Sequence, residues 1–66
     1  MENTQREIDS LLAIAEVSKS LGLSQSQVYA LVRERDFPKP IRIGRSSRWR
    51  TSVVNAWIDA KERASA

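Results

Sequence analysis

The charged side chains of one short segment carry the most specific chemistry in this sequence. Five residues between positions 39 and 50 are Lys or Arg, and none is acidic. Guanidinium and ammonium groups bind phosphates through charge-assisted hydrogen bonds, so this concentration of cations is typical of a polyanion-binding surface. The candidate phosphate-binding residues of the segment are Lys39, Arg42, Arg45, Ser46, Ser47, Arg48 and Arg50.

The rest of the chain does not share this positive charge. Residues 1–38 hold four basic and six acidic side chains, a net charge of −2, and residues 51–66 hold two of each sign. The formal net charge of +3 therefore arises entirely from the segment 39–50, whose own charge is +5. We expect double-stranded DNA as the partner of such a segment. The alternative is that five solvated charges only keep a small protein soluble.

The sequence lacks residues that several other classes of function need. The chain has no cysteine and no histidine, so it has no thiolate and no imidazole for catalysis or for binding zinc. We therefore expect no enzyme, no metal, no cofactor and no small-molecule substrate. The longest apolar stretch, around residues 11–15, is too short to span a bilayer, and the acidic N-terminus does not resemble a signal peptide. We expect a soluble, cytoplasmic protein without a membrane partner.

The first half of the chain has the pattern of two helices joined by a tight turn. After a polar tail over residues 1–9, apolar residues at spacing i, i+3 and i+7 predict a helix over residues 14–21, which Gly22 ends. Ser24 offers a hydroxyl to cap a second helix over residues 25–35. Helices joined this closely share a core only when they cross at a steep angle, as in a helix-turn-helix.

The second helix has an apolar stripe and an opposite polar side. Its inward residues at helical spacing are Val28, Leu31 and Val32. Polar side chains near a helix N-terminus suit contact with base edges and phosphates in a major groove. The candidate contacts are Ser24, Gln25, Ser26, Gln27, Tyr29, Ala30 and Arg33.

The segment that holds the cations has the pattern of a β-hairpin. Two prolines precede it, and apolar and basic residues then alternate with period two, which predicts a hairpin over residues 41–50 around a four-residue turn, 44–47. The residues expected on its inner face are Ile41, Ile43 and Trp49. The residues expected on its outer face and at its tip are Arg42, Arg48, Arg50 and Arg45. The outer arginines 42 and 50 are also placed to pair with Glu34 or Asp36.

A third helix is predicted over residues 52–62. Thr51 or Ser52 is expected to cap it, and its inner face is expected to carry Val54, Trp57, Ile58 and the stem of Lys61. A second stripe of small residues lies beside that face, and we interpret it as a wider core, with a protein contact as the alternative. This stripe contains Val53, Ala56 and Ala60.

These elements predict one domain over residues 10–63. Its fold class is mostly α with a small β-hairpin wing, a winged helix-turn-helix with three helices and a two- or three-stranded antiparallel sheet. One such module reads few base pairs, so we expect a homodimer or several copies on DNA.

Three stretches of the chain resemble the AlpA family of phage and prophage transcriptional regulators, a branch of winged helix-turn-helix proteins related to MerR-type and excisionase-type domains. They are LLAIAEVSKSLGLSQSQVYALV (Leu11–Val32), FPKPIRIG (Phe37–Gly44) and WRTSVVNAWI (Trp49–Ile58). The resemblance implies a sequence-specific DNA-binding regulator of a mobile element. The sequence departs from the family pattern at residues 30–32, which hold no basic residue, and at Asp36, where glycine is usual.

Two alternatives to transcriptional regulation remain open at this point. An excisionase-like architectural factor would use the same domain to bend DNA beside an integrase. A protein-interaction adaptor would have lost DNA binding, which the acidic first 38 residues favour.

Overall fold

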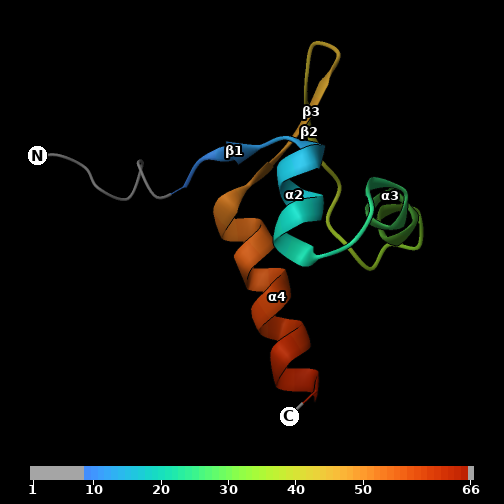
Figure 1. Ribbon diagram of the computed structural model, residues 1–66. Coiled ribbons are helices and arrows are strands. Elements are labelled where there is room, and N and C mark those ends of the chain that lie inside the picture. The colour runs from blue at the N-terminus through green and yellow to red at the C-terminus, as the bar shows by residue number, and fades with distance from the viewer. Residues whose placement is uncertain (1–8, 66) are drawn as a thin grey trace, which may run out of the picture.

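The computed structural model describes residues 9–65 of the chain, so residues 1–8 of the expected tail lie outside the described residues. Three helices and a three-stranded antiparallel sheet confirm the predicted winged helix-turn-helix fold class (Figure 1). In chain order, the elements are β1 (Leu11–Leu12), α2 (Ile14–Leu21), α3 (Gln25–Arg33), β2 (Ile41–Ile43), β3 (Ser46–Arg50) and α4 (Thr51–Ser65).

The turn between α2 and α3 is built from a left-handed glycine and a capping box. Gly22 takes φ 70°, a conformation that glycine adopts without steric cost, and it ends α2. The Ser24 hydroxyl then accepts the Gln27 N–H at 3.1 Å, and the Gln27 side-chain oxygen accepts the Ser24 N–H at 2.8 Å. These two bonds satisfy N–H groups that would otherwise be unpaired and fix where α3 begins.

Helix α3 ends at Arg33, two residues before the predicted end. The cause is Arg35, the only described residue other than glycine with a positive φ, which is 64°. The chain turns back there, so that the N–H groups of Asp36 and Phe37 both donate to the Leu31 carbonyl, at 2.9 and 3.1 Å. The left-handed position that closes a helix is occupied here by an arginine rather than a glycine.

The sheet has the order β1-β3-β2, with both neighbours antiparallel to β3. Ile43 pairs with Ser46, so the hairpin loop contains only Gly44 and Arg45 and not the four residues that we predicted. Gly44 takes φ 61° as the first loop residue, which suits a tight two-residue turn. We call this hairpin, residues 41–50, the wing. Its loop end extends beyond the helices (Figure 1).

The register of the strands contradicts the predicted assignment of residues to the two faces of the wing. Residues that pair directly in an antiparallel ladder point to the same face, and residues two apart in a strand share that face. Ile41 pairs with Arg48, and Arg42 pairs with Ser47. Ile41 and Ile43 therefore lie with Arg48 and Arg50, whereas Arg42 lies with Trp49 on the opposite face. The prediction was wrong because any hairpin loop with an even number of residues, two or four, places Ile41 and Ile43 on the same face as Arg48 and Arg50.

The core lies where the helices meet the inner face of the sheet. One residue each from α2, α3, the connector between α3 and β2, strand β3 and helix α4 is buried, and the five are Val17, Val28, Phe37, Trp49 and Val54. Trp49 is the largest of them, and its position on the central strand lets it contact both the connector and α3. The core is thin, as expected for a chain of this size.

Helix α4 begins one residue before its predicted start and ends three residues after its predicted end. The hydroxyls of its first turn are not its caps. The Thr51 hydroxyl donates to the Ser10 carbonyl at 3.0 Å, and the Ser52 N–H donates to the Asp9 carboxylate at 3.0 Å. Asp9 is thus a cap for a helix that begins 42 residues later in the sequence.

Candidate nucleic-acid interface

The first turn of α3 presents its polar side chains in two different ways. Ser24 and Gln27 are bonded to each other's backbone in the capping box, so their side chains position the helix. Gln25 and Ser26 are exposed and, within the described chain, make no side-chain hydrogen bond. These two are therefore available to an external partner, next to the positive end of the helix dipole.

The remaining candidates on α3 differ in exposure. Arg33 is exposed in the last turn. Ala30 is half-buried and does not lie on the fully exposed side as we predicted. The Tyr29 side chain is 37% exposed, and its ring centroid lies 6.4 Å from that of Trp49. Tyr29 thus joins α3 to the central strand of the sheet.

The inner face of the wing, which is the sheet face turned toward the helices, carries one exposed arginine. Arg42 shares that face with Trp49, which packs against the helices, but it lies farther toward the loop and is exposed. Its guanidinium Nη1 donates to the Ser47 hydroxyl at 3.1 Å. Arg45 is exposed in the loop itself, between Gly44 and Ser46.

Two other candidate arginines lie on the outer face. Arg48 is half-buried, and its Nη1 donates to the Ser47 carbonyl at 2.9 Å. Arg50 forms an ion pair with Asp9 at 3.1 Å. The predicted pairing of Arg42 or Arg50 with Glu34 or Asp36 is not formed among residues 9–65, because β3 carries Arg50 toward the N-terminal strand instead.

The pKa of the Asp9 carboxyl is lowered by the groups that bind it. The Ser52 backbone N–H, followed by the Ser52 side chain and the Arg50 guanidinium, holds the pKa of the Asp9 carboxyl below its ordinary value. All three stabilise the charged carboxylate. Sequence reasoning missed this residue because it belongs to a polar stretch without periodicity.

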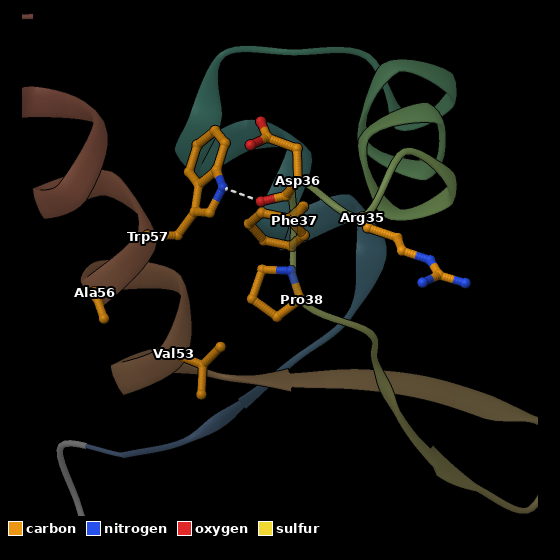
Figure 2. A pocket seen from close by; sticks show the side chains of 7 residues that line it. All are labelled: Arg35, Asp36, Phe37, Pro38, Val53, Ala56 and Trp57. Carbon is orange, nitrogen blue, oxygen red and sulfur yellow. Dashed lines mark hydrogen bonds between the residues drawn. The ribbon is translucent and has the colours of Figure 1, made fainter. Parts of the chain in front are cut away.

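Two tryptophans hold the connector that joins α3 to the wing. The indole N–H of Trp49 donates to the Pro38 carbonyl at 2.9 Å. The indole N–H of Trp57 donates to the Asp36 carbonyl at 2.7 Å, and Figure 2 shows this second bond. The Phe37 ring lies between them, with centroids 6.1 Å from Trp49 and 5.1 Å from Trp57. This arrangement fixes the position of the wing relative to α3. The sequence predicts buried indoles, but it does not reveal their acceptors.

Helix α4 also borders an open hollow beside this connector. The hollow has a volume of about 430 Å³ and is lined by Arg35, Asp36, Phe37, Pro38, Val53, Ala56 and Trp57 (Figure 2). Ala56 and Ala60 of the predicted small-residue stripe are exposed and Val53 is half-buried, so the stripe does not widen the core. The Lys61 ammonium lies near two of these lining residues, 3.0 Å from the Asp36 carboxylate and 5.3 Å from the centre of the Trp57 ring.

Two further observations concern the part of the chain that the structure describes. No group of three or more metal-ligating side chains lies together there. None of the helices between residues 9 and 65 has both the length and the hydropathy that crossing a bilayer requires.

The family described as "Prophage CP4-57 regulatory protein (AlpA)" matches residues 10–62. The chain belongs to the AlpA family. The match extends from β1 through the helix-turn-helix and the wing into α4, so it includes the complete described fold except the end of the last helix. The family is a phage regulatory one, in agreement with the resemblance seen in the sequence.

One relative from a phage is also similar to this AlpA-family chain. It is "Uncharacterized protein ORF88" of Enterobacteria phage P4, which is 35% identical over 51 residues, or 76% of this chain. The chain spans 58% of the length of that relative. No solved structure gives a significant match.

Proposed function

We propose that this AlpA-family protein is a sequence-specific DNA-binding transcriptional regulator of a prophage or other mobile element. Helix α3 enters the major groove, and the wing lies along the adjacent backbone or minor groove. The protein acts in the cytoplasm without a cofactor, and its partner is double-stranded DNA. The family's regulatory description supports the general class, and the geometry of α3 and the wing supports the mode of binding.

The dimensions and exposed side chains of α3 suit a major groove. Its nine residues form a helix about 14 Å long, against a groove about 12 Å wide. Gln25 and Ser26 can donate to and accept from base edges, and Arg33 can reach a guanine edge or a phosphate at the other end. Ser24 and Gln27 fix the first turn, so that its geometry is set before DNA is bound.

The observation that carries the proposal is that α3 and the inner face of the wing lie on the same side of the sheet. Trp49 is buried on this face and lies beside Tyr29 of α3, and Arg42 continues the same face toward the loop. Arg42 and Arg45 can therefore meet phosphates on the side where α3 meets bases. Lys39 is exposed in the connector between the two and adds a third cation.

The outer-face arginines have a smaller role in this proposal. Arg48 and Arg50 lie on the face of the sheet opposite to Trp49 and Arg42. They raise the local positive potential and so accelerate encounter with DNA, but they do not contact phosphates directly. Ser46 shares their face, whereas Ser47 lies beside Arg42.

A selection from random duplexes tests the proposal. The purified chain is incubated with double-stranded oligonucleotides of random sequence at near-physiological salt, and the retained molecules are sequenced over several rounds. We expect a short motif to be enriched, and we expect Ser26→Ala or Gln25→Ala to change the preferred base at one or two positions. Arg63→Ala, which removes an exposed charge near the end of α4, is the matched control and should leave the motif unchanged. Equal retention of all sequences would refute sequence-specific binding.

A further inference from the structure

The outer face of the sheet is unusually apolar for a surface. The register places six residues on it, and they are Leu11, Ile41, Ile43, Ser46, Arg48 and Arg50. Leu11 is 44% exposed, Ile41 is 40% exposed and Ile43 is 52% exposed. These three are among only four large apolar side chains that are exposed between residues 9 and 65; Tyr29 is the fourth. Three branched aliphatic residues on one face of a small domain mark an interaction surface.

The order of side chains across this face is apolar, basic, apolar. Leu11 lies on β1, Arg48 and Arg50 lie on the central strand β3, and Ile41 and Ile43 lie on β2. Adjacent strands are about 4.8 Å apart, so Leu11 lies roughly 10 Å across the sheet from the β2 row of Ile41 and Ile43, with the β3 cations between them. An α-helix has a diameter of about 10–12 Å with its side chains, which matches this width.

The charges decide among the possible occupants. Two copies placed face to face would bring the outer arginines of both against each other, which opposes a symmetric dimer. DNA would satisfy the arginines, but its phosphates offer no apolar surface to cover Ile41 and Leu11. Within residues 9–65, Arg48 has no carboxylate partner, whereas Arg50 already has Asp9. An acidic group flanked by apolar ones would pair with Arg48 and also cover the exposed aliphatic side chains.

We propose that this outer sheet face docks an acidic, amphipathic segment of another protein. A carboxylate of the segment pairs with Arg48, and leucine- or isoleucine-like side chains cover Leu11 on one side and Ile41 and Ile43 on the other. The face lies opposite to Arg42, so a protein can occupy it while DNA occupies the helix side. The docking itself does not depend on the proposed DNA binding.

A peptide selection tests this docking surface. A displayed library of 16-residue peptides with random sequence is selected on the immobilised full chain. We expect the enriched peptides to combine Asp or Glu with Leu, Ile or Phe at helical spacing. Arg48→Glu, and separately Ile41→Ser with Ile43→Ser, should each weaken binding of a selected peptide at least tenfold. Arg42→Glu changes the same charge on the opposite face and should leave peptide binding unchanged.

Charge exchange separates docking from loss of folding. A selected peptide whose acidic residues are replaced by Lys should bind Arg48→Glu better than it binds the unmodified chain. Thermal unfolding by circular dichroism checks each variant, and Ile43→Ser alone, at the most exposed position, replaces the double variant if that one unfolds.

Four results would overturn the proposal. One is the absence of enriched peptides, and another is a peptide set without acidic residues. A third is a dimer in sedimentation that Ile41→Ser with Ile43→Ser dissociates, which would make the occupant a second copy. The fourth is a loss of DNA affinity in that double variant equal to the loss in Arg42→Glu, which would make the occupant DNA. Failure of the wild-type chain to bind any DNA would instead refute the proposed function and leave peptide docking intact.

Discussion

At the scale of single residues, the fold depends on contacts between positions far apart in the sequence. Asp9 and Ser52 are 43 residues apart, and the bond between them attaches β1 to the start of α4. The two indole N–H groups similarly attach the connector to β3 and to α4. Such contacts stabilise a domain whose core contains only five buried residues among those described.

The first prediction concerns Asp9 and pH. Its pKa in the folded protein is lowered, so its carboxylate stabilises the fold above the ordinary aspartate pKa, and this contribution is lost as pH falls through the folded pKa. Asp9→Asn should therefore lower the melting temperature at pH 7 and flatten its decline below about pH 4. Asp59→Asn, on the exposed side of α4, is the control. Melting curves from pH 2 to pH 7 that are parallel for Asp9→Asn and the wild type would contradict this role.

The second prediction concerns the left-handed arginine. A residue with a Cβ costs about 1–2 kcal/mol in this conformation, whereas glycine does not pay this steric cost. Arg35→Gly and Arg35→Ala remove the same charge, but only the glycine relieves the strain at φ 64°. We expect Arg35→Gly to be more stable than Arg35→Ala by about 1 kcal/mol in urea unfolding. Equal stabilities would show that the chain does not hold this conformation in solution.

At the scale of elements, the wing divides its cations between two faces and a tip. In the proposed function, Arg42 and Arg45 meet phosphates together with α3, whereas Arg48 lies on the opposite face beside Ile41. This division depends on a loop with an even number of residues, here two. An odd number of loop residues would move Ile41 and Ile43 to the core side and Arg42 to the outer side.

The third prediction uses salt dependence to test that division. Four phosphate contacts, by Arg33, Lys39, Arg42 and Arg45, would give a slope of log affinity against log salt of roughly −3.6. Arg42→Ala and Arg45→Ala should each make this slope shallower by about one unit. Arg48→Ala should weaken binding only slightly at each salt concentration, with a change in slope well below one unit, which fluorescence anisotropy across a salt series would measure. A one-unit change for Arg48→Ala and none for Arg42→Ala would reverse the assignment of faces.

The sequence predicted the elements better than their faces and ends. Gly22 and Ser24 are local signals, so the turn between α2 and α3 was predictable from a few neighbouring residues. The faces of the wing depend on loop parity, which alternating residues alone do not specify. The end of α3 depends on a left-handed arginine, for which no sequence signal exists. The Asp9 cap of α4 and the indole acceptors join distant residues, so local pattern could not identify them.

At the scale of the whole molecule, two surfaces with different chemistry lie on opposite sides of one small sheet. The helix side combines polar α3 residues with exposed cations, and the outer side combines aliphatic residues with Arg48. A regulator with this arrangement can hold DNA on one side and a protein on the other. The concentration of positive charge in residues 39–50, against a net negative first half, orients the molecule toward a polyanion through the wing.

The most direct test of DNA binding by α3 and the inner wing face is a titration followed by nuclear magnetic resonance. The ¹⁵N-labelled chain is titrated with a duplex obtained from the random selection, and backbone amide shifts are recorded. We predict the largest changes at Gln25, Ser26, Arg42 and Arg45, with small changes at Leu11 and Arg48. Large changes at Leu11 and Arg48 with none at Gln25 and Ser26 would contradict this mode of binding, and the outer sheet face would then be the DNA-binding surface.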